Sequence, residues 1–169
     1  MFALTATSTA GSSLPVTVAV QSGPATISGN TVTITGLGTV VLAATQPGNT
    51  DYFAATPVTQ SFTVTAAPTL ASLSTASSVA PGQFVTLTAT IASTTTGTPT
   101  GTVTFYYGSR SIGTSTIGAS GVAALTTHPL PVGRTNTFTA SYGGTVDYLA
   151  STSPAVTVAV VPPGQTPMQ

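Results

Sequence analysis

The chain has 169 residues, only four of which carry a formal charge, and its formal net charge is zero. Because acid–base catalysis, metal binding and phosphate recognition need several ionisable side chains at one place, this composition argues against an enzyme, a metal site and any cofactor. With two basic residues in all, the chain also lacks the basic footprint of a nucleic-acid-binding protein.

Apolar residues alternate with hydroxylated residues along the whole chain, which predicts an all-β fold. At 85–91, for example, Val85, Leu87 and Ile91 alternate with threonines. Since successive side chains of a strand point to opposite faces, each such run has one apolar face and one hydroxylated face. In chain order, we predict strands at 3–9, 15–21, 24–28, 31–36, 39–45, 58–66, 70–78, 83–93, 101–108, 111–117, 121–127, 134–143 and 153–160.

An internal repeat divides the chain into two successive β units. The sequence DYFA at 51–54 recurs as DYLA at 147–150, each copy following a turn that contains glycine. Between the closing strand of one unit and the opening strand of the next lies a short Ala-Ala-Pro segment. We therefore predict a first domain at 1–67, a second domain at 68–161 and a tail or linker at 162–169.

Several short sequences in the second half are typical of one family. They are PGQFVTLTAT at 81–90, TPTGTVTF at 98–105, LPVG at 130–133 and TASYGG at 139–144. Through them, residues 69–160 resemble the bacterial immunoglobulin-like (Ig-like) repeat, which occurs in tandem in large surface and secreted proteins.

The first half carries weaker signals of a related Ig-like repeat: LPV at 14–16, SGPAT at 22–26 and GLGTV at 36–40. The two resemblances imply two tandem Ig-like antiparallel β-sandwiches with Greek-key connections and an extracellular or cell-surface location. Relatives often carry an acidic residue where this chain has Gly144, which weakens any transfer of ion or ligand binding to that corner.

The repeated corner contains the only two carboxylates, Asp51 and Asp147, beside Tyr52 and Tyr148. Calcium binding would require six to eight oxygen ligands, whereas each aspartate stands alone. We interpret these four residues as structural: each carboxylate caps its turn, and the tyrosine packs on the end of the sandwich.

Tyr106 and Tyr107 are the best candidates for ligand-binding aromatic residues, because alternation predicts that one of them points outward. His128, Arg110 and Arg134 are interpreted as single loop residues, since one histidine without cysteine or glutamate completes neither a zinc site nor a catalytic triad.

Three functions remain open from the sequence. The first is a structural, non-catalytic module of an extracellular bacterial stalk, adhesin or filament, acting as a rigid spacer or fibre subunit, with neighbouring Ig-like domains or copies of itself as partners. The second is an Ig-like module that binds a glycan or a protein. Enzyme activity is the weakest of the three, and no run of apolar residues is long enough to span a membrane.

The first domain is short for an Ig-like sandwich, and we expect it to lack its first strand. Its exposed edge could accept a strand from another chain, for which 156–169 is a candidate donor, although Pro162 and Pro163 limit pairing. The alternative is that the strand lies upstream of the sequence shown.

Overall fold

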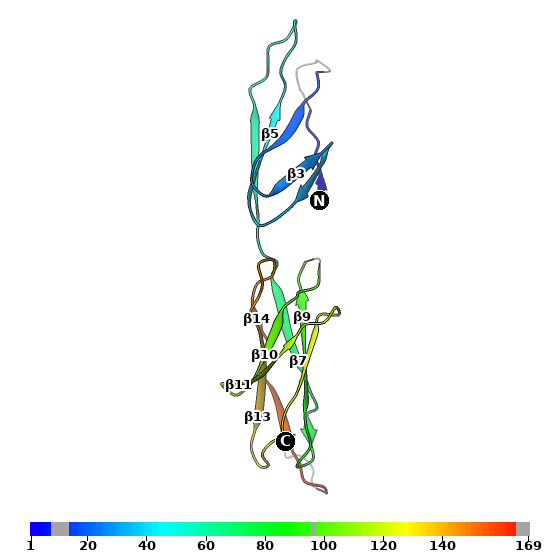
Figure 1. Ribbon diagram of the computed structural model, residues 1–169, viewed down its shortest axis with the longest axis vertical. Helices are drawn as coiled ribbons and strands as arrows, with labels where there is room; N and C mark the ends of the chain where they lie inside the picture. The colour runs from blue at the N-terminus through cyan, green and yellow to red at the C-terminus, as the bar shows by residue number, and fades with distance from the viewer. Residues whose placement is uncertain (8–13, 96, 165–169) are drawn as a thin grey trace. The chain divides into compact units, whose positions relative to one another are not determined.

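A computed structural model describes residues 1–7, 14–95 and 97–164 (Figure 1). The chain forms two compact units, Met1–Thr65 and Ala66–Gln169, called here the first and second units. Every regular element in the described residues is a β-strand, which confirms the prediction of an all-β fold. Residues 8 and 9 of the first predicted strand and 165–169 of the predicted tail lie outside the described residues.

The first unit consists of two three-stranded sheets. One has the order β1-β4-β3 and the other β2-β5-β6, and all pairs are antiparallel. Its strands are β1 (Phe2–Ala3), β2 (Thr17–Ser22), β3 (Ala25–Ser28), β4 (Thr31–Ile34), β5 (Gly38–Thr45) and β6 (Val58–Val64).

The core of the first unit is small. Val32, Val40 and Leu42 are buried, and they come from the two central strands, β4 and β5. The side chains around them are only partly buried, among them Phe62 on β6. Phe2 packs edge-on against Phe62, with ring centroids 5.5 Å apart.

The second unit is a two-sheet sandwich. One sheet has the order β12-β9-β7, and the other has the order β11-β10-β13-β15-β8, with β14 also paired to β13. Its strands are β7 (Thr69–Ser74), β8 (Ser78–Val79), β9 (Thr86–Ser93), β10 (Thr102–Tyr107), β11 (Arg110–Thr116), β12 (Val122–Thr126), β13 (Asn136–Tyr142), β14 (Ser151–Thr152) and β15 (Val156–Val160).

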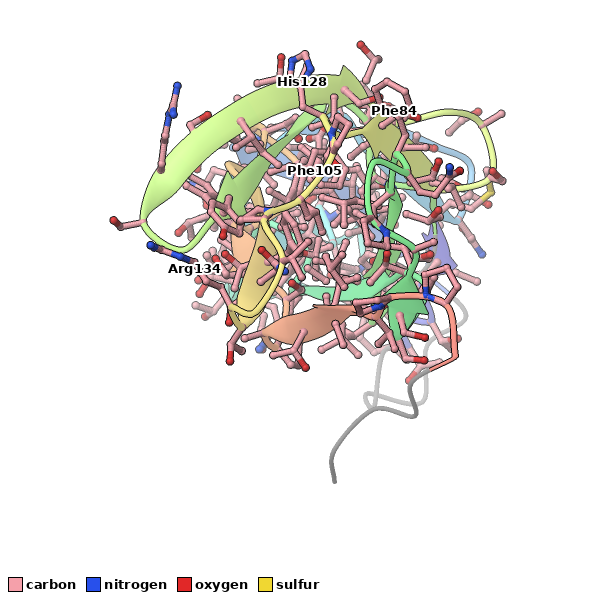
Figure 2. The ribbon with its side chains drawn as sticks, turned by 90° about the horizontal axis from the view of Figure 1, so that it is seen from below. Phe84, Phe105, His128 and Arg134 are labelled. Atoms are coloured by element: carbon pink, nitrogen blue, oxygen red, sulfur yellow. The ribbon has the colours of Figure 1, made fainter. Side chains whose placement is uncertain are left out.

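Both sheets of this sandwich contribute to one continuous core of fourteen buried residues. Leu87 and Ile91 enter it from β9, while Phe105 and Phe138 enter it from the opposite sheet. Figure 2 shows Phe105 inside the unit and His128 at its periphery. The alternation in the sequence therefore matches the pattern of buried and exposed residues, because each strand turns its apolar side chains toward the facing sheet.

Some predicted strands have different bounds. The predicted strand at 70–78 is two strands, β7 and β8, which lie in different sheets; β8 pairs in parallel with β15, the one parallel strand pair among the described residues. The predicted strand at 153–160 is shortened rather than divided: β15 begins only after Pro154, because proline cannot donate to a sheet ladder. The predicted strand at 3–9 reduces to β1 within the described residues.

Candidate functional site

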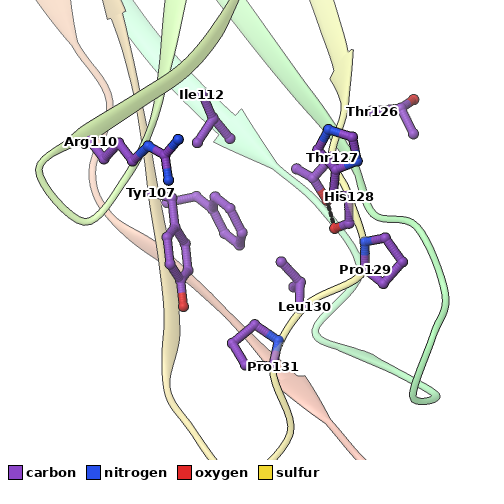
Figure 3. A pocket seen from close by; sticks show the side chains of 10 residues that line it. Tyr107, Arg110, Ile112, Thr126, Thr127, His128, Pro129, Leu130 and Pro131 are labelled. Atoms are coloured by element: carbon purple, nitrogen blue, oxygen red, sulfur yellow. Dashed lines mark hydrogen bonds between the residues drawn. The ribbon is translucent and has the colours of Figure 1, made fainter.

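The second unit contains a groove at the end of its larger sheet, which we call the Tyr107 groove (Figure 3). It lies where β10 turns into β11 and where the loop after β12 crosses the sheet. The groove has a volume of about 300 Å³. It is lined by Tyr107, Arg110, Ile112, Thr126, Thr127, His128, Pro129, Leu130, Pro131 and Phe138.

The floor of the groove is apolar. Tyr107 and Phe138 face each other across paired strands, with ring centroids 5.3 Å apart and planes inclined at 45°. Ile112 and Leu130 pack against the same core cluster. An apolar floor of this kind can pack against an apolar part of a ligand, such as the face of a sugar ring or an aliphatic side chain.

An arginine and a histidine stand at the rim. Arg110 begins β11 and His128 follows β12, and both are exposed. Figure 3 shows them on opposite sides of the groove, with Leu130 between and below them. A ligand in the groove would therefore meet an apolar floor, the cation of Arg110 and the hydrogen-bonding ring of His128.

The loop that forms one wall is fixed by hydrogen bonds. Thr127 donates its backbone N–H to Val85 O at 2.8 Å and its hydroxyl to His128 O at 2.9 Å. At the loop's far end, the fully buried Asn136 accepts the Tyr107 hydroxyl at 2.9 Å. The amide nitrogen of Asn136 also lies 3.2 to 3.3 Å from the carbonyl oxygens of Pro131, Arg134 and Val158.

The structure places the two predicted ligand-binding tyrosines differently. Tyr107 shares the inner face with Val103 and Phe105 and lines the groove, but Tyr106 does not line it. Both side chains are half-buried. The groove also brings together Arg110 and His128, which the sequence suggested only as separate loop residues.

The sequence reasoning missed the role of Asn136. A polar residue at the start of the apolar alternation of β13 is the signal that could have revealed it, since a polar group at an inward position must find partners. Arg134 is exposed and does not line the groove.

In the part of the chain that the structure describes, the two aspartates of the repeated corners do not cap their turns. In the first unit, the side-chain oxygen of Asn49 accepts the N–H groups of Asp51 and Tyr52, both at 2.9 Å, so the cap expected from Asp51 comes from Asn49. Tyr52 is half-exposed, whereas Tyr148 of the second unit packs against the core. Neither carboxylate accepts a hydrogen bond from a described residue.

No cluster of three or more His, Asp or Glu side chains suited to a metal ion occurs in the described ranges. No helix of the described chain is long and apolar enough to cross a membrane. No curated protein matches the chain.

The fold of the second unit agrees with a family comparison. Residues 70–161, more than half of the chain, match the family described as Bacterial Ig-like domain (group 3). The matched region extends from β7 to the end of β15 and contains the Tyr107 groove. The chain belongs to the bacterial Ig-like domain (group 3) family.

Proposed function

We propose that this chain is a structural, non-catalytic module of an extracellular bacterial stalk, adhesin or filament, acting as a rigid spacer or fibre subunit. Its family is generally non-enzymatic, and bacterial Ig-like domains are often found in surface proteins. The surface carries almost no charge, which favours close lateral packing with neighbouring Ig-like domains or with copies of itself.

The observation that carries this proposal is the fixed start of the second unit. Ala67 donates its N–H to Asp147 O at 2.8 Å and accepts the N–H of Leu149 at 2.9 Å. The hydroxyl of Thr69 lies 2.8 Å from Leu149 O and 2.7 Å from the hydroxyl of Ser151. The incoming chain is therefore bound to the corner of its own unit from Ala67 onward.

The linking chain is correspondingly short. β6 ends at Val64, so only Thr65 and Ala66 precede the first of these hydrogen bonds. A flexible linker of many residues allows wide angular freedom, and we infer that a linker of two residues restricts it. A spacer needs a stiff connection, because it must hold the parts that it joins at a fixed distance.

The width of a distance distribution between the two units tests the proposal. The chain has no cysteine, so Thr33→Cys and Ser109→Cys, both at exposed positions, give a clean pair of spin-label sites. We expect a narrow distribution that broadens when four glycines are inserted after Thr65. A wild-type distribution as broad as that of the insertion variant would refute the spacer role.

The Tyr107 groove supports a second candidate function, binding of an acidic glycan. A sugar ring would pack on the apolar floor formed by Tyr107 and Leu130, and a sugar carboxylate would pair with Arg110 at the rim. We expect the chain to bind polygalacturonate and not neutral dextran.

A matched pair of variants tests this candidate. Arg110→Gln removes the cation at the groove, while Arg134→Gln removes one that does not line it. A loss of about tenfold in affinity is what removal of a charge-assisted contact costs. Such a loss in Arg110→Gln, with no change in Arg134→Gln, would support the glycan site. Equal binding of both variants would exclude it.

A further inference from the structure

The closing strands of the two units pair in the same register. In the first unit, Val40 lies opposite Phe62 in the pairing of β5 with β6. In the second unit, Asn136 lies opposite Val158 in the pairing of β13 with β15, at an offset of ninety-six residues in both strands. The two units can therefore be compared position by position along this hairpin.

The corner between these strands also has one geometry in both units. Gly48 and Gly144 have φ values of 76° and 80°. A Cβ on either glycine would collide with the same backbone atoms, including Ala54 N at 2.7 Å in the first unit and Ala150 N at 2.9 Å in the second. The repeated sequences at 51–54 and 147–150 therefore form corners with the same backbone geometry.

In the second unit, one continuous segment, 66–79, pairs with three structures: the corner, β9 and β15. Ala67 bridges the corner through Asp147 O and Leu149 N. β7 then pairs with the outer edge of β9, and β8 pairs with the outer edge of β15. A single extended stretch therefore completes the corner and both sheets.

In the first unit, no described residue occupies any of these three positions. β1 pairs with β4 as β9 pairs with β12, and β6 pairs with β5 as β15 pairs with β13, and both β1 and β6 are edge strands of their sheets. The N–H of Phe53, which corresponds to that of Leu149, has no hydrogen-bond acceptor among the described residues. The side chain of Phe53 is fully exposed, that of Val58 is 66% exposed, and the four residues 58–61 of β6 are all exposed.

We propose that the first unit is an acceptor for an extended segment with the chemistry of 66–79. The segment must present a backbone N–H and C=O to the corner at 51–53 and then alternate apolar with small polar residues along the free edges of β1 and β6. This is recognition by strand addition, in which backbone hydrogen bonds give affinity and inward side chains give specificity.

The second unit shows which side chains give that specificity. On β7, Ala71 and Leu73 are buried in the core, whereas Leu70 is 65% exposed. The occupant of the first unit therefore needs small or aliphatic residues at the positions of Ala71 and Leu73, and tolerates polar residues between them. A proline at the position of Ala67 would remove the N–H that the corner accepts.

The carboxy-terminal segment predicted as a donor does not meet this description. Its part Val156–Val160 is β15, which is paired with β13 and β8 in the second unit, and Val158 is fully buried there. Releasing β15 would open the core of the second unit. The occupant is instead a segment like the one that opens an Ig-like module.

A synthetic peptide with the sequence of 66–79 is the direct test. Added to the full chain, it should slow amide exchange at Phe53 and along β6, measured residue by residue by NMR. At a peptide concentration about ten times the Kd, we expect exchange there to slow about tenfold. The amides of β9 and β13 in the second unit serve as the internal reference and should not change.

Two peptide variants make the test specific. Leu73→Asp in the peptide places a charge at an inward position and should abolish the protection, whereas Leu70→Asp changes an outward position and should keep it. No protection by the wild-type peptide, or equal protection by both variants, would overturn the acceptor. The width of the distance distribution between the units tests the spacer role separately, so the two proposals fail in different experiments.

Discussion

The hydroxyl of Tyr107 donates a 2.9 Å hydrogen bond to the side-chain oxygen of Asn136, which is fully buried. This bond joins the end of β10 to the start of β13 at the base of the Tyr107 groove. Because the amide nitrogen of Asn136 also faces the carbonyl oxygens of Pro131 and Arg134, one side chain holds both the groove's aromatic floor and its loop wall.

Asn136→Leu should destabilise the second unit strongly. The substitution keeps the branched shape of the side chain but removes its hydrogen bonds to the Tyr107 hydroxyl and to three carbonyl oxygens. Each part-buried hydrogen bond contributes about 0.5 to 1.5 kcal/mol, and a buried polar group that loses its partner costs about 1 to 3 kcal/mol, so we expect a loss of about 3 kcal/mol in the free energy of unfolding. Urea denaturation followed by tyrosine fluorescence measures it.

Tyr107→Phe is the control for this prediction. It removes only the hydroxyl, and we expect a loss of about 1 kcal/mol. If Asn136→Leu were no more destabilising than Tyr107→Phe, the role of Asn136 as the organiser of the loop would be refuted.

The division of β7 from β8 shows what alternation could not predict. Both segments have strand-like sequence at 70–78, so a continuous strand was the natural expectation. The choice of sheet is decided by long-range partners, because β7 pairs with β9 and β8 pairs with β15, far away in the sequence. Two-residue alternation specifies which face is apolar, but it does not specify the neighbour.

The candidate site was predictable only in part. The sequence identified Tyr106 and Tyr107 as candidates, of which only Tyr107 lines the groove, and it treated Arg110 and His128 as unconnected residues. Their proximity depends on the loop after β12 folding back over β10, and that loop is fixed by Asn136 and by the bond from Thr127 to Val85. Such contacts carry no periodic signal in a sequence.

The corner glycines should be intolerant of any side chain. Gly144 has a φ of 80°, and a Cβ there would lie 2.7 Å from Tyr148 O and 2.9 Å from Ala150 N. Because both neighbours are backbone atoms, Gly144→Ala must displace the corner, and we expect a loss of more than about 2 kcal/mol in unfolding free energy. Thermal unfolding of the variant measures it.

Gly82→Ala separates conformational strain from collision. Gly82 has a similar φ of 79°, but a Cβ there would meet no atom within 4 Å. The variant should therefore lose only about 1 kcal/mol, the cost of a left-handed backbone for a residue with a Cβ. Equal losses of unfolding free energy for Gly82→Ala and Gly144→Ala would show that the close contacts at the corner add nothing to the cost of the substitution.

The first unit should open more readily than the second. Among the described residues, its core contains three buried hydrophobic residues, whereas the core of the second unit contains fourteen, and local stability follows the apolar surface that each unit buries. Amides of β5 should exchange at least about tenfold faster than amides of β13, which corresponds to about 1.4 kcal/mol in opening free energy. Equal protection of these two central strands would contradict the comparison.

Sodium chloride should change the stability and association of this chain very little. The formal charges belong to Asp51, Arg110, Arg134 and Asp147, and all four residues are exposed. Exposed charges contribute little to the free energy of folding. Salt screens the interactions between charges, and this chain has few charges to screen. We expect the thermal midpoint and the sedimentation coefficient to stay nearly constant between about 0.05 and 1 M NaCl, a range over which the Debye length falls from more than about 10 Å to about 3 Å. If sedimentation revealed an oligomer that dissociated as salt was raised, attraction between charges would be responsible for assembly, and the packing of uncharged, hydroxyl-covered surfaces would have to be abandoned as its basis.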